Sequence, residues 1–316
     1  MTYPCKVAIV GAGYMADEHI KAFRDIPGVE LSGIFSRTYE RAGNLAKKWS
    51  IQKVCRSIDE LYNNTRADLV IVTVPELATK SVVQQCFGYS WTCLIEKPVG
   101  YNLTEAEAIT QSAQISGAKA FVALNRRHYS STLAMLNDLA KNSEPRLIQI
   151  QDQQDAISAL KAGQPEEVVA NWMYANSIHL IDYLSILGRG KVTEIQSLIP
   201  WTPQDPRYVA TKIQFDSGDI GFYQGVWNAP GPWAVSVTTP SKRWEMRPLE
   251  KGFYQPYGSR QLEPVEIDSW DQQFKAGLRR QAQLAIRAAS GESIPELPTL
   301  EDALASMRLV QAIYGI

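Results

Sequence analysis

The first half of the chain alternates apolar runs with stretches that have helical spacing. Residues 7–10, 68–74 and 92–95 are apolar or nearly so over their whole length, as in strands buried on both faces of a parallel sheet. Helical patterns follow them, two with candidate capping boxes at Ser57–Glu60 and Thr104–Glu107. We therefore predict strands at 7–10, 29–35, 68–74, 92–95 and 119–124, with helices at 41–49, from 57 and at 104–117. Such alternation predicts a doubly wound parallel sheet that binds ligands at the carboxyl ends of its strands.

The second half changes to a period of two. Residues 211–215 alternate apolar and polar side chains, and Asp216-Ser217-Gly218-Asp219 follows them as a turn. This pattern is typical of a sheet with one face in water. We predict strands at 146–151, 192–199, 208–215, 220–227, 235–239 and 243–247, and helices at 131–141, 272–289 and 300–314.

Length and charge narrow the class of protein. A chain of 316 residues is long enough for two domains. The net charge of -1 argues against a nucleic-acid partner or an anionic membrane surface. The chain enters its first strand directly after Met1–Cys5, without room for a signal peptide, and its four cysteines form no CxxC pair. We expect a cytoplasmic protein with reduced thiols, no membrane span and no metal site.

The opening strand ends in a glycine motif. Gly11, Gly13 and Ala16 fill a Gly-x-Gly-x-x-Ala pattern between a strand and a helix. The first glycine permits a tight turn, the second lets the backbone approach a pyrophosphate, and Ala16 lets helix and strand pack closely. The motif therefore predicts a dinucleotide at the start of this helix.

The end of the second strand bears on the choice of dinucleotide. Enzymes that prefer NAD usually place Asp or Glu here for the ribose 2′-hydroxyl, whereas this chain has Ser36-Arg37-Thr38. Arg37 offers a charged fork and its neighbours offer hydroxyl donors. We expect NADP(H) to be preferred. The alternative is that Arg37 stacks on adenine or points to solvent, and that NAD(H) also binds.

Glu96-Lys97-Pro98 stands at the end of the strand at 92–95. A lysine at this sheet edge can polarise a substrate oxygen or share its proton. Pro98 fixes the turn, and its peptide bond can be cis. The alternative is a salt bridge between Glu96 and Lys97.

A candidate catalytic helix lies in the second half. Asn176, His179 and Asp182 fall at i, i+3 and i+6, so they can share a helix face. A neutral histidine suits general acid or base catalysis of a hydroxyl–carbonyl couple. Six aromatic residues could stack on a sugar ring or belong to the core: Trp172, Tyr174, Trp201, Trp227, Trp233 and Tyr254.

Together these motifs resemble the glucose–fructose oxidoreductase / inositol dehydrogenase / MocA (Gfo/Idh/MocA) family over essentially the whole chain. The resemblance is carried by the glycine motif, His19, Glu96-Lys97-Pro98, Asn125-Arg126-Arg127 and the capped final helix after Leu297-Pro298. It implies an α/β Rossmann domain at 1–124. It also implies an α+β domain at 125–316 with an open, mostly antiparallel sheet, whose last helix, 300–314, packs back on the first domain. Hydride transfer between NAD(P) and a sugar, polyol or sugar nucleotide follows by resemblance, with ketone reduction as one direction. By the same analogy the open sheet face forms a homodimer or homotetramer.

The predicted site residues fall into three groups, and we predict no metal ligand. The catalytic residues are Lys97, His179 and Tyr174. The cofactor-binding residues are Gly11, Gly13, Tyr14, Met15, Ala16, Ser36, Arg37, Thr38, Val74, Pro75, Glu96 and Lys97. The substrate-binding residues are Asn125, Arg126, Arg127, Trp172, Asn176 and Asp182.

One departure from the family pattern leaves a second function open. Members usually carry an Asp one turn before the histidine, where this chain has Ala175. Tyr174 could supply a proton in its place, whereas Asn176 could only position a sugar. Lys97 and His179 favour an enzyme, and Ala175 favours a cofactor-binding sensor or co-regulator without turnover.

Overall fold

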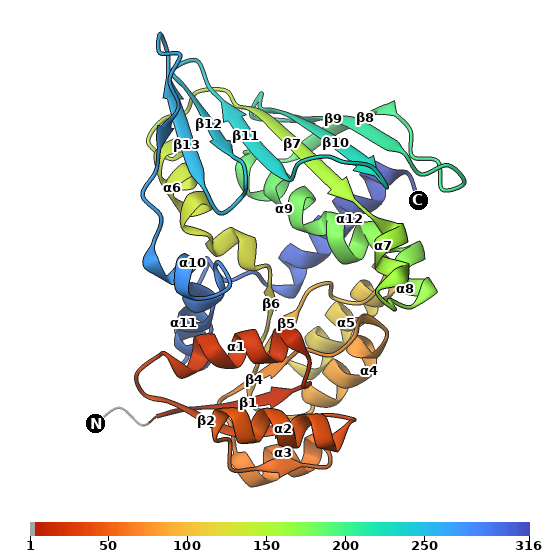
Figure 1. The fold of residues 1–316 in the computed structure, drawn as a ribbon, viewed down its shortest axis with the longest axis vertical. Coiled ribbons are helices and arrows are strands. Elements are labelled where there is room, and N and C mark those ends of the chain that lie inside the picture. The colour runs from red at the N-terminus through yellow and green to blue at the C-terminus, as the bar shows by residue number, and fades with distance from the viewer. Residues whose placement is uncertain (1–3) are drawn as a thin grey trace. The chain divides into compact units, whose positions relative to one another are not determined.

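The computed structural model describes residues 4–316, which form two compact units (Figure 1). The first unit runs up to Asn125 and takes in Trp270–Leu304. The second unit consists of Arg126–Ser269 and Ala305–Ile316. The predicted division was a single cut between residues 124 and 125. In the structure, by contrast, Trp270–Leu304 packs with the first unit.

The first unit is a six-stranded parallel sheet with helices, as predicted. Its strands are β1 (Cys5–Val10), β2 (Val29–Phe35), β3 (Val54–Cys55), β4 (Leu69–Val72), β5 (Thr92–Glu96) and β6 (Ala120–Ala123). Its helices are α1 (Tyr14–Arg24), α2 (Tyr39–Trp49), α3 (Ile58–Thr65), α4 (Glu76–Cys86), α5 (Leu103–Ser116), α10 (Ser269–Gln273, which begins at the unit boundary) and α11 (Leu278–Ala289). The order β3-β2-β1-β4-β5-β6 is that of a dinucleotide-binding Rossmann sheet.

Both faces of this sheet are covered, which explains its unbroken apolar strands. Every residue of β4 is buried. Side chains on one face pack with α3, α4 and α5, and those on the other face pack with α1 and α11. In parallel sheets that are covered on both faces, ligands bind outside the carboxyl ends of the strands.

Two local predictions need correction in this unit. Asn102, rather than Thr104, is the N-cap of α5, and its side chain accepts from the backbone N–H of Glu105 at 2.9 Å. Both positions match the capping pattern, but the chain turns into the helix two residues earlier. The helix predicted at 272–289 is interrupted, because Gly277 adopts φ +77° between α10 and α11.

The second unit is built on an eight-stranded, mostly antiparallel sheet. Its strands are β7 (Leu147–Gln154), β8 (Val192–Ile199), β9 (Tyr208–Phe215), β10 (Ile220–Trp227), β11 (Ala234–Thr238), β12 (Lys242–Met246), β13 (Gly252–Pro256) and β14 (Glu263–Pro264). The order is β14-β13-β12-β11-β7-β10-β9-β8, and the pair β7–β10 is parallel. The remaining elements are the 3₁₀ turn η1 (Asn125–His128), α6 (Ser130–Leu139), α7 (Ala156–Lys161), α8 (Glu166–Ala170), the π-helical turn η2 (Met173–Ser177), α9 (Ile178–Leu187) and α12 (Leu300–Tyr314). The boundary between the units runs through two of these elements, since Asn125 of η1 and Leu300–Leu304 of α12 belong to the first unit.

One face of this sheet is covered by helices and the other is open. Helices α6, α9 and α12 lie on one side of it (Figure 1). On β7, Ile148 and Ile150 are buried beneath the helices, while Gln149 and Gln151 are exposed. The predicted alternation of buried and wet positions is therefore confirmed.

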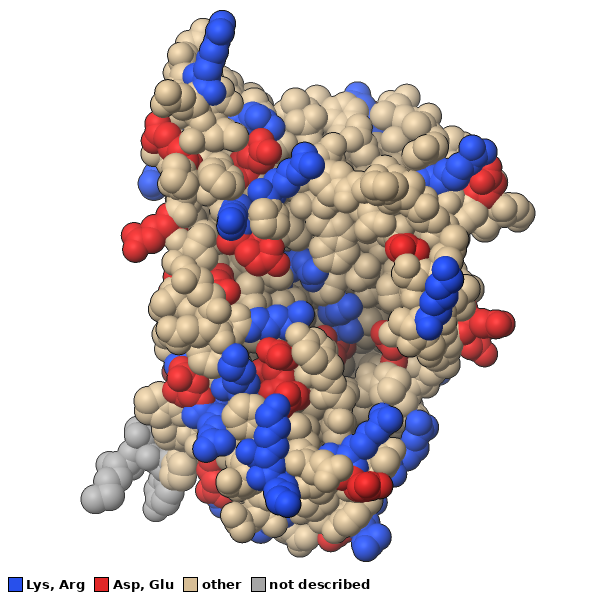
Figure 2. Space-filling model, in the orientation of Figure 1, with Lys and Arg blue, Asp and Glu red and all other residues tan. Residues whose placement is uncertain are grey.

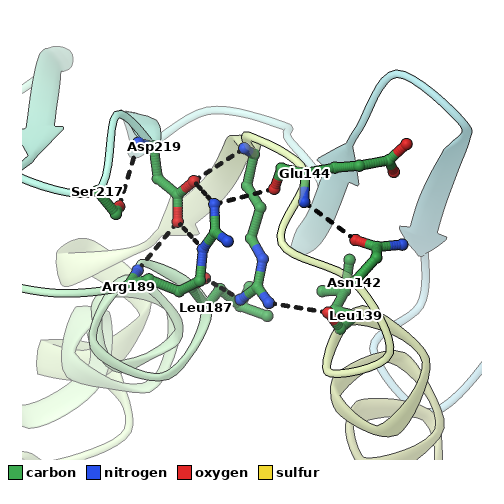
Figure 3. A network of polar contacts seen from close by, with 8 residues as sticks. Leu139, Asn142, Glu144, Leu187, Arg189, Ser217 and Asp219 are labelled. Atoms are coloured by element: carbon green, nitrogen blue, oxygen red, sulfur yellow. Dashed lines mark hydrogen bonds and ion pairs between the residues drawn. The ribbon is translucent and has the colours of Figure 1, made fainter.

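A buried carboxylate holds two helix ends of this unit on the sheet (Figure 3). Asp219 accepts from the guanidinium of Arg189 at 2.9 and 2.6 Å and from the backbone N–H of Arg146 at 2.9 Å. Arg146 in turn donates to the carbonyls of Leu187 (2.7 Å) and Leu139 (3.1 Å), at the ends of α9 and α6. Burial would raise the pKa of Asp219, but these hydrogen bonds lower it below its ordinary value. The network fixes the far end of the helix that carries His179.

The charged side chains do not gather into one field. Figure 2 shows Lys and Arg interspersed with Asp and Glu over the visible face, in agreement with the net charge of -1. Between residues 4 and 316 no helix is both long and apolar enough to cross a membrane.

Candidate functional site

The glycine loop joins β1 to α1 and leaves its surface open. Gly11 has φ +115°, and a Cβ there would lie 2.4 Å from the carbonyl oxygen of Thr73. Gly13 is the N-cap of α1, and a Cβ at that position would meet nothing within 4 Å. Ala16 is fully buried. Gly11 is thus required because its backbone lies against the carbonyl of Thr73, and Gly13 leaves room for an anion at the helix N-terminus.

The end of β2 carries the residues predicted to read the ribose. Ser36 is half-buried, whereas Arg37 and Thr38 are exposed just before α2. A dinucleotide held on the glycine loop places its adenosine half near the end of β2. These side chains are therefore accessible to such a ligand.

Arg56 is a further cation near the end of β2, and no sequence pattern predicted it. It directly follows β3, in which Cys55 pairs with Phe35 at the end of β2. Its guanidinium lies 4.5 Å from the ring centre of Tyr39, the first residue of α2. The sequence alone could not place Arg56 beside Tyr39, because its position depends on how the two-residue strand β3 pairs with β2.

The carboxyl ends of β1, β4 and β5 bring three predicted segments to one edge. Neighbouring strands pair Val10 with Val72 and Val72 with Ile95. The residues that follow are the glycine loop, Val74-Pro75 and Glu96-Lys97. Lys97 is half-buried, and the Lys97–Pro98 peptide bond is cis. The glycine loop and the candidate catalytic lysine therefore share one edge of one sheet.

His19 and Glu96 connect this edge to α1. The Nε2 of His19, which is 1% exposed, lies 2.7 Å from Oε1 of Glu96. The other oxygen, Oε2, accepts from the backbone N–H of Lys97 at 3.2 Å. The carboxylate of Glu96 is thus engaged by His19 and by the backbone next to the lysine side chain. Both residues belong to the family pattern, but their pairing across 77 positions was not predicted.

In the second unit the predicted catalytic helix begins with a π-turn. The backbone N–H of Ile178 donates to the carbonyl of Met173, five residues earlier. Asn176 lies inside this turn, whereas His179 and Asp182 lie in α9. The expected single helix face is therefore distorted at its start. π-turns within helices are often found at functional sites.

The π-turn alters which residue lies one helical turn before His179, on the same side of the helix. Because the backbone hydrogen bonds of this turn span five residues instead of four, that position shifts from Ala175 toward Tyr174. Tyr174 is 3% exposed and His179 is 8% exposed. Burial raises the pKa of the Tyr174 hydroxyl, which keeps it protonated near neutral pH.

Arg126, Trp233 and His179 come together beside this turn. The ring centres of His179 and Trp233 are 6.2 Å apart. The guanidinium carbon of Arg126 lies 4.7 Å from the ring centre of Trp233. Trp233 also lines a cavity of about 730 Å³ formed by residues 230–233 and 247–250, a volume suited to a small organic ligand.

Three predicted substrate ligands already make contacts within the protein. Arg127 donates to both oxygens of Asp182 at 2.8 and 2.7 Å, and Ser306 donates to the same carboxylate at 2.6 Å. Asn125 donates to the carbonyl of Ala276 at 3.0 Å. Their roles toward a substrate stay predictions.

Trp172 differs from these three residues. It precedes the π-turn and is half-buried. Its buried indole N–H has no hydrogen-bond partner among residues 4–316. Its role as a substrate ligand also stays a prediction.

Metal and disulfide chemistry have no visible basis in the described residues. Among residues 4–316, no group of three His, Cys, Asp or Glu side chains could hold a metal ion. The four cysteines are free thiols, and burial raises the pKa of Cys86 to about 12 and of Cys5 to about 11.

Comparison with known proteins adds a family match. Residues 5–124 match an oxidoreductase family described as having an NAD-binding Rossmann fold, the Gfo/Idh/MocA family. The chain is 23% identical over 197 residues to 4-carboxy-2-hydroxymuconate-6-semialdehyde dehydrogenase of Sphingobium sp. (strain NBRC 103272 / SYK-6). That match covers 61% of the chain and 62% of the relative, less than two thirds of its length.

A longer match and a solved structure cover nearly the whole chain. Inositol 2-dehydrogenase 1 of Paenarthrobacter aurescens (strain TC1) is 23% identical over 305 residues, covering 85% of the chain and 86% of that protein. A crystal structure described as that of an NADPH-dependent oxidoreductase of Desulfitobacterium hafniense DCB-2 superimposes with a TM-score of 0.83. It is 18% identical and covers 99% of this chain and 95% of that one. At this identity the structural match establishes the two-domain fold.

Proposed function

We propose that the chain belongs to the Gfo/Idh/MocA family of oxidoreductases, whose model matches residues 5–124, and that it transfers a hydride between NADP(H) and a carbohydrate. The reacting group is a hydroxyl or carbonyl of a sugar, polyol or sugar nucleotide, and reduction of a ketone is the direction that we favour. NAD(H) is the weaker of the two cofactors in this proposal.

One observation carries the proposal. The open surface over Gly13 and the side chain of Lys97 belong to the same carboxyl edge of the parallel sheet. A nucleotide bound on the first would extend along the edge that bears the second. An amine beside a reacting carbonyl can donate a hydrogen bond to its oxygen.

The residues present fit the dinucleotide. The glycine loop has the empty space that a pyrophosphate needs, and residues 36–38 carry no carboxylate that would repel a 2′-phosphate. Ser36, Arg37 and Thr38 would hold that phosphate, with Arg56 nearby. When bound, the nicotinamide supplies or accepts the hydride. The Glu96 carboxylate, engaged by His19, supports the backbone beside Lys97.

The proton is handled by three side chains in this proposal. Lys97 polarises the substrate oxygen. His179 and Tyr174 supply the second acid or base. Burial raises the pKa of Tyr174, so its hydroxyl is protonated at neutral pH and can act as a donor but not as a base. Tyr174 thereby takes the role of the aspartate that family members usually carry one turn before the histidine.

The substrate is bound by an aromatic face and a cation. Trp233 lines the cavity, its ring lies near that of His179, and Arg126 lies over it. An indole face suits the C–H face of a sugar ring, while a guanidinium suits a phosphate or carboxylate. Trp172 and Asn176 remain further candidates for contact with the sugar hydroxyls.

We also propose that the chain forms a homodimer or homotetramer through the open face of the eight-stranded sheet. That face bears half-buried Phe222 and Val226 beside Gln149 and Gln151. Analytical ultracentrifugation of the wild type checks the subunit number.

Fluorescence titration with NADPH and NADH, followed by turnover assays with keto sugars and sugar nucleotides, tests the function. We expect tighter binding of NADPH, together with its oxidation by a member of the panel. Tight binding without turnover across the panel would favour a sensor or co-regulator, for which Ala175 is the sequence argument.

A further inference from the structure

We propose that Asp152 and Tyr314 are positioning residues that hold the π-turn η2 in place through a buried chain of hydrogen bonds. The π-turn carries Tyr174 and Asn176, so the C-terminal helix α12 becomes part of the support of the substrate site. The kinetic consequence of this proposal depends on the proposed function, whereas its structural consequence does not.

The buried face of β7 turns polar toward the end of the strand. The inward positions are Ile148, Ile150, Asp152 and Gln154, and the last two are 1% and 0% exposed. Asp152 accepts from the hydroxyl of Tyr223 at 2.7 Å and from the amide Nε2 of Gln154 at 2.6 Å. A carboxyl group is thus placed where an apolar side chain would continue the core.

Two consecutive residues of the π-turn are attached to this group. Asn176 donates from Nδ2 to Oε1 of Gln154 at 2.8 Å. The hydroxyl of Ser177 lies 3.1 Å from that of Tyr314 and also hydrogen-bonds the Asp152 carboxylate. The turn is therefore held from the sheet side by β7 and from the helix side by α12.

Three aromatic side chains fix the end of the hydrogen-bond network that lies at α12. The hydroxyl of Tyr314, the last residue of α12, lies 2.9 Å from the hydroxyl of Tyr223 and accepts from the indole N–H of Trp227 at 3.2 Å. All three side chains are at most 3% exposed. Rotation of Tyr314 would leave several buried polar groups without partners, which gives the network one preferred arrangement.

Burying these groups is costly, and packing alone would not require it. An apolar core of the same volume would avoid the desolvation of a carboxylate and several hydroxyls. The groups instead meet at a turn whose backbone hydrogen bonds span five residues, a geometry that is rare in proteins. We infer that the network fixes the π-turn rather than the sheet.

Amide hydrogen exchange gives the direct test, because it needs no substrate. Tyr314→Phe removes one oxygen, and Asp152→Asn is isosteric. We expect each variant to increase exchange of the amides at residues 173–178 at least about tenfold. Tyr314→Phe removes the hydroxyl that contacts Ser177, Tyr223 and Trp227, and Asp152→Asn removes the buried carboxylate acceptor. Amides of β1 and α1 in the other unit should keep their wild-type rates.

Tyr183→Phe is the matched control. Tyr183 is also buried in the second unit, and its hydroxyl pairs with that of Thr132 at 2.9 Å, away from the network. It should leave exchange at residues 173–178 unchanged. Wild-type exchange there in both Tyr314→Phe and Asp152→Asn would overturn the proposal. If Asp152→Asn does not fold, Tyr314→Phe alone decides.

The kinetic readout separates positioning from the proposed chemistry. On the substrate identified by the panel, Tyr314→Phe should raise KM about tenfold and also lower kcat, because the turn carries both Asn176 and the proposed proton donor Tyr174. NADPH binding should not change. A fall in kcat at constant KM would contradict positioning of substrate contacts. If the wild type turns over no substrate, the proposed function fails, and hydrogen exchange still tests the network.

Discussion

At the scale of single residues, the choice of cofactor depends on side chains that the sequence identifies only in part. Ser36-Arg37-Thr38 can be found because the end of the second strand is marked by its apolar run. Arg56 could not be found, since its place beside Tyr39 follows from the pairing of β2 with the two-residue β3. Likewise, the contact of His19 with Glu96 joins positions 77 residues apart.

Arg37→Ala should weaken NADPH binding about tenfold to a hundredfold and NADH binding little, because a charge-assisted hydrogen bond to the 2′-phosphate would be lost. Paired fluorescence titrations measure both constants. Arg66→Ala is the control, since this exposed arginine of the same unit stacks on Tyr62 at the end of α3. Equal losses for both cofactors would contradict the 2′-phosphate assignment.

Asp152 should make stability depend on pH. Burial raises its pKa to about 6 against the hydrogen bonds of Tyr223, Ser177 and Gln154 and the charge of Arg126. The unfolded chain loses this proton near pH 4 and the folded protein only near pH 6, so stability falls as pH rises through that window. A shift of about two units corresponds to about 3 kcal/mol.

Asp152→Asn should remove that slope, because the amide stays neutral. Urea denaturation between pH 4 and 7.5 would then show the variant gaining on the wild type as pH rises. Parallel curves for the two proteins would mean that Asp152 does not titrate in this range.

At the scale of elements, burial pattern and turn chemistry predict most of the chain. The strands 29–35, 192–199, 208–215 and 220–227 appear with the predicted bounds, because their apolar patterns are bounded by turn residues. The cap of α5 was misplaced, since Asn102 and Thr104 both satisfy the same local rule. The π-turn η2 was missed because its sequence is indistinguishable from ordinary helix until the backbone hydrogen bonds are known.

Tyr174→Phe should lower kcat about a hundredfold if the hydroxyl replaces the missing carboxylate as proton donor. NADPH binding should stay at its wild-type value, because Tyr174 belongs to the second unit. Steady-state kinetics measures kcat, and a direct binding titration measures the affinity for NADPH. An unchanged kcat would leave His179 as the acid.

Asp219→Ala should destabilise the protein by about 3 kcal/mol, because it leaves the guanidinium of Arg189 and the backbone N–H of Arg146 without their buried partner. Asp205→Ala is the control, since the Asp205–Arg207 pair is exposed on both sides and should contribute less than about 1 kcal/mol. Denaturation midpoints measure both. Equal effects would mean that Asp219 is no anchor for α9.

At the scale of the whole molecule, the sequence predicts two units but not how the chain is shared between them. Strand and helix alternation ends near residue 124, which marks the first break. The return of Trp270–Leu304 to the first unit depends on contacts of α11 with α1 and of β6 with residue 299. Such contacts join segments more than 170 residues apart and leave no local pattern.

Replacement of Lys97 tests the proposed chemistry most directly. Lys97→Ala should reduce kcat by at least about a thousandfold, while NADPH binds as tightly as to the wild type, because the glycine loop and residues 36–38 are untouched. Lys97→Arg keeps the charge and controls for simple electrostatics. Retained turnover in Lys97→Ala would show that the lysine at the end of β5 does not act on the substrate oxygen.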